Sequence, residues 1–172
     1  MIKKIISGGN PGVEIAALDA AIRLDIPHAG WCYRDRKTDG GVLAEHCNVK
    51  EIDNPSYFER LEKNIIDSAG TIVLTYGQLA LGYKAVKDLA VNHNKPLLDV
   101  NRGERSIDNT VSLIRDWMSN HAVDTIYFTG SKTGLDHGTK IYDEVIQIIR
   151  GICGIAREKY FGFQEEDDVA PY

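Results

Sequence analysis

The first thirty residues constrain the fold more than any other part of the chain. A predicted strand over residues 3–7, with Ile5 and Ile6 at its centre, leads into a glycine-rich segment at 8–12, and small apolar residues then recur at spacings of three and four over 13–24. This periodicity predicts a helix with one apolar face that lies close to a sheet. Asn10 is a favourable N-cap and Pro11 suits the first helical position, so we expect the helix to begin at Pro11.

The glycine-rich segment predicts an anion site formed by Gly8, Gly9, Asn10 and Gly12. Glycines let the backbone turn sharply and approach a ligand, and a helix N-terminus offers free N–H groups and the positive end of the helix dipole. A phosphate or another anion on a small molecule is the expected ligand. The spacing is GGxxG rather than the GxGxxG of dinucleotide-binding folds, and the alternative is that the glycines only serve a tight turn.

Strands and helices are expected to alternate along the rest of the chain. Further strands are predicted within 26–32 and at 71–75, 97–100 and 125–129, with helices at 57–69, 79–93, 107–121 and 137–160. This order predicts a three-layer, doubly wound Rossmann-like α/β fold with a mostly parallel sheet. We expect a single domain over 1–163 and an acidic C-terminal tail over 164–172. Arg60, Asn64 and Asp67 share one face of the second helix, which we interpret as solvated.

In such a fold ligands bind outside the carboxyl ends of the strands. The loops expected at that edge are 8–12, 32–37, 76–82, 101–105 and 129–134. The cations after the second strand favour a phosphate contact, and the alternative is a solvated polar loop. The loop after the last strand holds hydroxyls and a lysine that could contact an anion, and the alternative is a surface turn. The candidate binding residues in these loops, beyond the first, are Arg34, Arg36, Gly77, Gly82, Gly130, Ser131 and Lys132.

The helix expected at 137–160 carries two apolar stripes. A helix with two apolar faces predicts one contact with the sheet and one with a partner subunit, hence a dimer or tetramer. The alternative is a helix buried more deeply within a monomer. The stripes are Ile141, Val145, Ile148, Ile152 and Ile155, and Ile146, Ile149 and Cys153.

Composition excludes several classes of function. The 172 residues carry a net charge of −5, which argues against a broad nucleic-acid-binding face. No apolar run approaches the ~20 residues of a membrane helix, and the chain begins with a core strand, so we expect neither a membrane span nor a signal peptide. Three widely spaced cysteines indicate reduced thiols in the cytoplasm and no CxxC metal site. The five histidines are scattered, and no catalytic or metal-binding group is predicted.

Taken together, several short motifs resemble the molybdenum cofactor carrier protein family, a Rossmann-like group related to the LOG proteins. The resemblance covers residues 2 to about 150. It implies a homo-oligomer that binds molybdopterin or a similar phosphorylated ligand and protects it unchanged, with molybdoenzymes as partners, and it adds Trp31 to the expected binding residues. The motifs are Ile6-Ser7-Gly8-Gly9-x-x-Gly12-Val13, Ala16-Ala17-Leu18-Asp19-x-Ala21, Gly30-Trp31-Cys32, Arg60-x-x-x-Asn64-x-x-Asp67-Ser68 and Lys95-Pro96-Leu97.

The alternative is a nucleotide-binding protein or a LOG-like nucleoside-monophosphate phosphoribohydrolase. LOG enzymes use a PGGxGTxxE stretch whose glutamate stabilises the oxocarbenium-like state. The corresponding residues 76–85 contain no carboxylate, which favours a binding protein over an enzyme. The chain also departs from the carrier pattern at Asn10, Pro11, Tyr33, Asp35, Gly40, Ala80, Leu81, Gly82, Tyr83, Ser131 and Lys132.

Overall fold

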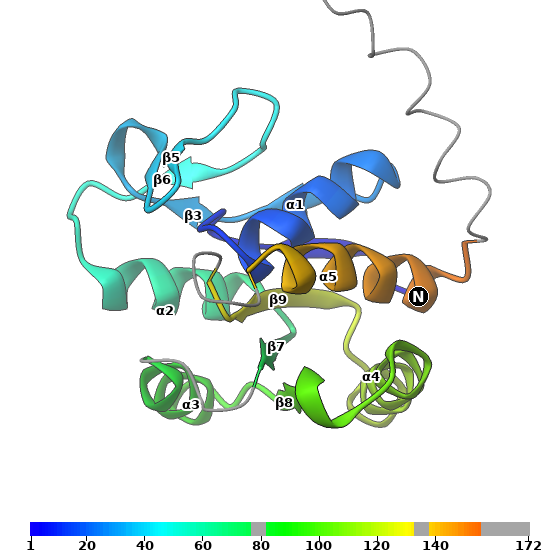
Figure 1. The fold of residues 1–172 in the computed structure, drawn as a ribbon. Helices are drawn as coiled ribbons and strands as arrows, with labels where there is room; N and C mark the ends of the chain where they lie inside the picture. Colours follow the sequence, from blue (N-terminus) through cyan, green and yellow to red (C-terminus); the bar gives the residue numbers. More distant parts are fainter. Residues whose placement is uncertain (77–81, 133–137, 156–172) are drawn as a thin grey trace, which may run out of the picture.

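A parallel five-stranded sheet forms the centre of the molecule (Figure 1). The computed structural model describes residues 1–76, 82–132 and 138–155. The strands lie in the order β2 (His28–Ala29), β1 (Lys4–Ile6), β9 (Thr125–Gly130), β7 (Gly70–Thr75) and β8 (Leu97–Asn101). The flanking helices are α1 (Val13–Arg23), α2 (Tyr57–Asp67), α3 (Tyr83–Asn92), α4 (Ile107–His121) and α5 (Gly138–Cys153), with short 3₁₀ turns at Arg34–Arg36 and Arg102–Glu104.

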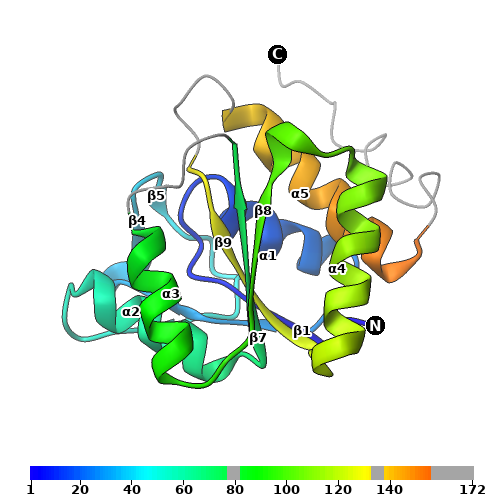
Figure 2. The same ribbon diagram turned by 90° about the horizontal axis from the view of Figure 1, so that it is seen from below.

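Helices cover both faces of the sheet, as Figure 2 shows. Successive strand residues point to opposite faces. Ile5 and Ile126 therefore pack with α1, α4 and α5, whereas Ile6 and Tyr127 pack with α2 and α3. Each strand pairing in this sheet is parallel. The predicted three-layer, doubly wound α/β fold is confirmed.

The strand order places a topological switch point at β9. The connection after β1 runs through α1 on one face, and the connection after β7 leads to α3 on the other face. β9 lies between these two strands, so the chain diverges on either side of its carboxyl end. In open α/β sheets such a switch point is where ligands bind.

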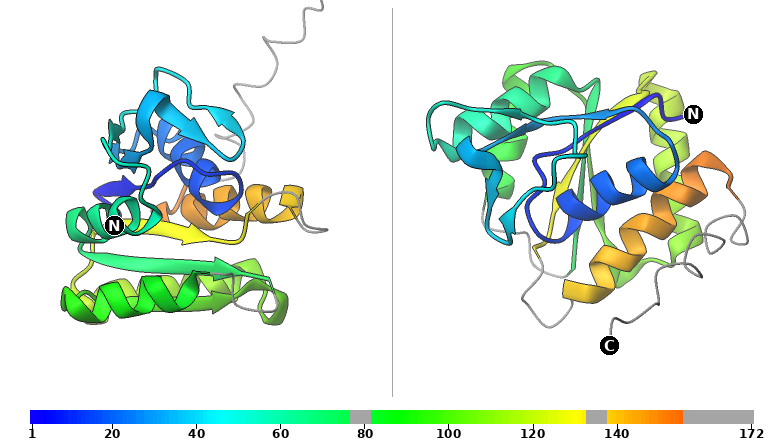
Figure 3. Two further views of the ribbon diagram at one scale, coloured as in Figure 1. Left: turned by 90° about the vertical axis from the view of Figure 1, so that its left-hand side faces the viewer. Right: turned by 90° about the horizontal axis from the view of Figure 1, so that it is seen from above.

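The segment after β2 forms a small subdomain rather than the expected polar loop. The strand expected within 26–32 is divided into β2 and β3 (Trp31–Cys32), and β3 pairs in parallel with β6 (Lys50–Glu51). Between them, β4 (Lys37–Thr38) and β5 (Gly41–Val42) form an antiparallel hairpin. Figure 3 shows this segment lying beside α1. It contacts the glycine-rich segment at residues 8–12, called the glycine loop below, since Leu43 lies against Gly9 and Gly40 against Pro11.

The first helix begins at Val13, so the predicted start at Pro11 is wrong. Gly12 is the N-cap residue, with φ +98° and ψ −125°, and it has no side-chain cap. This conformation lies outside the helical region, so residues before Gly12 cannot continue the helix. Asn10 instead lies in the preceding buried turn, where its carbonyl accepts a hydrogen bond from the N–H of Ile15.

The last helix ends at Cys153, earlier than the expected end at residue 160. Gly154 has φ +71°, and the N–H of Ile155 donates to the carbonyl of Arg150, which closes the helix. Ile155 is therefore not part of an apolar helical stripe. Residues 156–160 lie outside the described residues, as does the tail at 164–172.

The second apolar stripe of α5 is buried within the same chain. Ile146 and Ile149 are 4% and 0% exposed, because α5 packs against both α1 and α4 as well as the sheet. The deeply buried monomer helix is thus the correct interpretation, and this stripe does not support a subunit contact. A dimer or tetramer remains a prediction. Among the described residues, the helices are too short or too polar to span a bilayer.

Candidate functional site

Hydrogen bonds join the start of α1, the loop after β9 and the end of β7 at the carboxyl edge of the sheet. The N–H of Val13 donates to the carbonyl of Ser131 at 3.1 Å, and the N–H of Ser131 donates to the carbonyl of Leu74 at 2.9 Å. Gly12 lies against the backbone of Ser131 and Lys132. The structure therefore brings the glycine loop together with Gly130, Ser131 and Lys132, as the sequence predicted for loops at one edge.

A buried carboxylate, Glu14, lies behind the glycine loop. Its Oε2 accepts from the N–H of Asn10 at 3.1 Å and from Nη1 of Arg60 at 2.9 Å. Its Oε1 accepts from the hydroxyls of Tyr127 at 2.9 Å and Thr129 at 3.0 Å. The Glu14 carboxylate is thus an anion of the protein itself at the start of α1, and it accepts the hydrogen bond that the N–H of Asn10 donates.

Arg60 and Asn64 are buried, so the interpretation of their helix face as solvated is wrong for these two residues, whereas Asp67 is exposed as expected. The Arg60 side chain is 1% exposed and lies under Gly8, with its guanidinium 5.2 Å from the ring of Tyr33. Asn64, one turn later, is also buried and hydrogen-bonds the backbone of Trp31 through both its oxygen and its nitrogen. The i, i+4 spacing of Arg60 and Asn64 indicated that they share one helix face. Their polarity favoured an exposed face, and the spacing alone does not show that the face is buried.

The Glu14–Arg60 pair is ionised in the folded protein. Burial raises the pKa of Glu14, but the charge and hydrogen bond of Arg60, with the hydrogen bonds from Asn10 and Tyr127, outweigh burial and hold this pKa below its usual value. Burial lowers the pKa of Arg60 while Glu14 raises it, and the net shift is upward. Burial, followed by the charge of Glu14, raises the pKa of Tyr127 well above its usual value.

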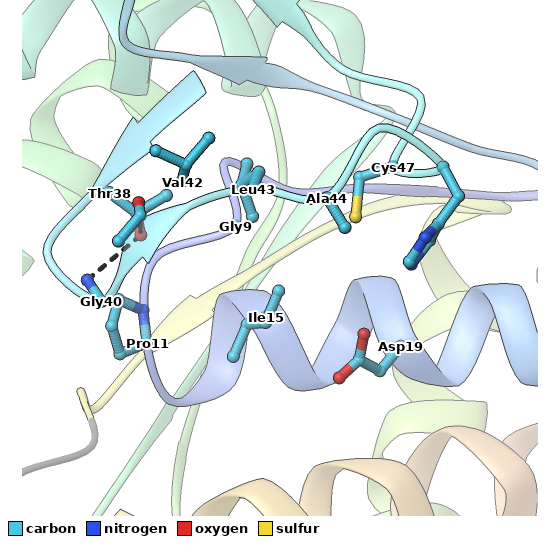
Figure 4. Close-up of a pocket in the computed structure, with 12 residues that line it drawn as sticks. Gly9, Pro11, Ile15, Asp19, Thr38, Gly40, Val42, Leu43, Ala44 and Cys47 are labelled. Carbon is cyan, nitrogen blue, oxygen red and sulfur yellow. Dashed lines mark hydrogen bonds between the residues drawn. The ribbon is translucent and has the colours of Figure 1, made fainter. Parts of the chain in front are cut away.

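A pocket of about 460 Å³ opens on the other side of the glycine loop (Figure 4). It lies between α1 and the segment that follows the β4–β5 hairpin, and side chains from both enter it. Residues of the glycine loop form part of its wall, and a carboxylate, an imidazole and a thiol provide polar groups. The lining residues are Gly9, Pro11, Ile15, Asp19, Thr38, Gly40, Gly41, Val42, Leu43, Ala44, His46 and Cys47.

Arg36 holds one wall of this pocket in place. Its Nε donates to the carbonyl of Leu43 at 3.1 Å, and its Nη2 donates to the carbonyls of Ala44 at 2.6 Å and Cys47 at 2.8 Å. A planar guanidinium is suited to this task because its N–H groups point in fixed directions. The predicted phosphate-binding cation therefore has a structural role that its sequence neighbourhood did not indicate.

Two other predicted cations form exposed ion pairs. Arg34 lies 3.4 Å from a carboxylate oxygen of Asp53, and both side chains are exposed. Lys132 pairs with Asp39, and both are about half exposed. Asp39 stands between Thr38 and Gly40, two residues that line the pocket, so the pair with Lys132 links the pocket rim to the loop after β9.

Trp31 and Gly82, two of the remaining candidates, lie apart from the pocket. Trp31 packs over α2, where its indole N–H donates to Asp67 at 2.8 Å and the ammonium of Lys63 lies 4.4 Å from its ring. Gly82 precedes α3 and lies against the hydroxyl of Tyr57. Gly77 lies outside the described residues. Trp31 and Gly82 are not among the residues that line the pocket.

Replacing Arg36 with alanine should lower the free energy of unfolding by about 1–2 kcal/mol, because three backbone carbonyls lose a charged donor. Amide hydrogens of residues 43–47 should also exchange faster, since the wall loses its anchor. Urea unfolding and hydrogen-exchange mass spectrometry measure the two effects. The matched control is Arg34→Ala, which removes only an exposed ion pair and should cost below about 0.5 kcal/mol. Equal effects of the two substitutions would contradict this role for Arg36.

Comparison with known proteins agrees with this architecture. The model of the family described as "Circularly permutated YpsA SLOG family" matches residues 5–153. The chain is also similar to a solved structure from Syntrophus aciditrophicus SB named "Putative molybdenum carrier protein", with 33% sequence identity and a TM-score of 0.82. That similarity covers 88% of this chain and 94% of the other. Comparison with curated protein sequences gave no match. The chain belongs to the circularly permuted YpsA family of SLOG proteins.

Proposed function

We propose that this protein binds a phosphorylated small molecule of the molybdopterin type in the pocket beside the glycine loop and carries it unchanged. The observation that carries the proposal is the position of the pocket: Gly9 and Pro11 of the glycine loop form part of its wall. Its volume of about 460 Å³ is within the range of small-molecule sites. The solved relative named a molybdenum carrier supports this class of cargo.

The residues around the pocket fit such a ligand. Ile15, Val42 and Leu43 offer apolar contacts to a ring system. Lys132 offers a cation at the rim, and its present partner, Asp39, is exposed. An exposed ion pair contributes about 0–1 kcal/mol, so a phosphate dianion can replace the Asp39 carboxylate on Lys132 at little cost. The bound molecule is the cargo, and the protein's own residues position it and shield its ring from water.

A hydrolytic role is less well supported. Glycosidic cleavage needs a carboxylate that contacts the sugar or the water that attacks it. The buried carboxylate beside the glycine loop is Glu14, and its two oxygens already accept four hydrogen bonds from the protein. Glu14 therefore has a structural role. The proposal assigns no covalent step to this protein.

Two substitutions at the pocket rim should change anion affinity in opposite directions. Lys132→Gln should weaken binding of inorganic pyrophosphate about tenfold, because the phosphate loses a charged donor. Asp39→Asn should strengthen it several-fold, because the competing carboxylate is removed from Lys132. Isothermal titration calorimetry at fixed ionic strength measures both affinities. Mass spectrometry of small molecules retained after gentle purification would identify the natural cargo.

The opposed signs distinguish the proposal from general charge effects. Arg34→Gln removes the same charge as Lys132→Gln from an exposed position and serves as the control, with an expected change below about twofold. If Lys132→Gln and Asp39→Asn both leave the pyrophosphate affinity unchanged, phosphate does not bind at this rim and the proposed function is wrong.

A further inference from the structure

We propose that Asp19 selects the ring of the bound molecule and that this ring carries an N–H beside an exocyclic amino group, the pattern shared by guanine and pterins. The inference rests on the proposed function, because it assigns the inner part of the same pocket. Three features of that pocket support the proposal. Asp19 supplies the only carboxylate among its lining residues, its walls are apolar, and the Lys132–Asp39 pair lies at its rim rather than beside Asp19.

Asp19 presents its carboxylate to the pocket from the side of α1. It follows Ile15 by one helical turn, so both side chains lie on the face of α1 that meets the opposite wall. Figure 4 shows Asp19 on α1, across from the segment that carries Ala44 and Cys47. The pKa of the Cys47 thiol is raised by burial and then by the charge of Asp19, which agrees with a carboxylate facing that wall.

A hydroxyl fixes the orientation of this carboxylate. The phenol of Tyr142 on α5 donates to Oδ2 of Asp19 at 2.5 Å. A carboxylate has about four lone-pair positions on its two oxygens, so one hydrogen bond leaves both oxygens able to accept others. Asp19 is thus held in one orientation with acceptor capacity left for a ligand.

The chemistry of a fixed carboxylate determines which rings it can recognise. A carboxylate only accepts hydrogen bonds, and it accepts two parallel donors in a bidentate arrangement. Guanine and pterin rings present such a pair, a ring N–H beside a 2-amino group. Adenine presents an amino group beside a ring nitrogen that accepts, and this nitrogen would face a carboxylate oxygen without a shared proton. Asp19 therefore favours the first class over the second.

The apolar lining suits a planar ring. Ile15 lies on one wall and Val42 and Leu43 on the other, so the two faces of a ring would contact aliphatic side chains. The lining runs from Asp19 to Thr38 and Gly40, the two neighbours of Asp39, which pairs with Lys132. A ring beside Asp19 would therefore leave the rim to a phosphate near Lys132.

The test compares GMP, AMP and 6-hydroxymethylpterin by isothermal titration calorimetry. We expect GMP to bind at least about tenfold more tightly than AMP, and Asp19→Asn to weaken GMP and pterin binding at least about tenfold. AMP and inorganic pyrophosphate should bind this variant as they bind the unchanged protein. The pterin arm, which lacks phosphate, shows whether the ring alone binds beside Asp19.

Two controls locate the effect. Tyr142→Phe removes the orienting hydroxyl but keeps the carboxylate, and it should change GMP affinity less than Asp19→Asn does. Should Asp19→Asn fold poorly, Ala44→Phe, at an exposed position of the lining, narrows the pocket and should lower GMP affinity while leaving pyrophosphate affinity unchanged.

The outcomes separate this inference from the proposed function. If pyrophosphate binds and Asp19→Asn leaves the affinities for GMP and pterin unchanged, Asp19 does not select the ring and the inference is wrong, while the proposed function stands. Equal affinities for GMP and AMP in the unchanged protein would also overturn it. If pyrophosphate, GMP and pterin all fail to bind, the proposed function itself is wrong and the inference fails with it.

Discussion

Replacing Glu14 with alanine should lower the free energy of unfolding by about 3–5 kcal/mol, because it leaves the Arg60 guanidinium buried without a counter-charge. The two side chains lie 2.9 Å apart and are only 7% and 2% exposed. Tyr127, Thr129 and the N–H of Asn10 also lose their acceptor. Such a loss is a large part of the stability of a typical domain, so the variant should unfold at far lower urea concentration.

Two controls assign this loss to the unpaired charge. Asp88→Ala breaks the exposed Lys84–Asp88 pair, which is 2.6 Å long, and should cost below about 0.5 kcal/mol. The double variant Glu14→Leu, Arg60→Met removes both buried charges of this pair and should recover part of the stability lost in Glu14→Ala. A double variant as unstable as the single one would show that the penalty has another source.

The same carboxylate makes stability depend on pH in a defined direction. The pKa of Glu14 is lowered in the folded state from an ordinary value of 4.5, so on acidification the unfolded chain takes up this proton first. Its contribution is therefore complete above pH of about 5 and is lost as the pH falls through the lowered folded-state pKa. Glu14→Gln cannot ionise there, so urea unfolding at several acidic pH values should give a flatter profile for this variant.

Gly12→Ala should lower the free energy of unfolding by about 2–6 kcal/mol through two separate effects. The residue has φ +98°, which disfavours any side chain. A Cβ there would also lie 2.2 Å from the carbonyl oxygen of Ser131 and 2.8 Å from Cα of Lys132, and backbone atoms cannot move aside cheaply. The glycine loop and the loop after β9 should separate, and thermal unfolding with circular dichroism measures the loss.

Gly41→Ala isolates the first of these effects. Gly41 has φ +118°, but a Cβ at this position would meet nothing within 4 Å. It should therefore lose only about 1–3 kcal/mol, the cost of the backbone conformation. Equal losses at Gly12 and Gly41 would mean that the loop after β9 moves freely, which would argue against a rigid junction of the two loops.

The fold was predictable because its signals are local. The apolar runs at 71–75 and 125–129 and the helical spacing over 13–24 are properties of neighbouring residues. The order of the strands was not predicted, because it depends on how these elements pack. The convergence of the glycine loop with Ser131 and Lys132 followed from the rule that parallel strands end at one edge. Local signals failed at helix ends, where Gly12 and Gly154 adopt positive φ values that composition alone does not specify.

The site was less predictable, because the role of a polar side chain depends on its partner. Glu14 and Arg60 are 46 residues apart and meet only when α2 packs below the glycine loop. Arg36 resembles a ligand-binding cation in the sequence, yet in the fold it binds three carbonyls of its own segment. Asp19 has no sequence neighbour that indicates a pocket, since the opposite wall comes from residues 38–47.

The sequence by itself determined the α/β architecture, the glycine loop at the start of the chain and the sheet edge where ligands are expected. These features depend on backbone propensity and hydrophobic periodicity, which are properties of neighbouring residues. Only the tertiary structure decided which charges are paired, which apolar stripe of α5 is covered by α1 and α4, and where a pocket opens. Periodicity indicates that a helix face is apolar, but it does not indicate which segment covers that face. Burial and charge pairing are set by segments far apart in the chain, and the contact between them exists only once the sheet and its helices are assembled.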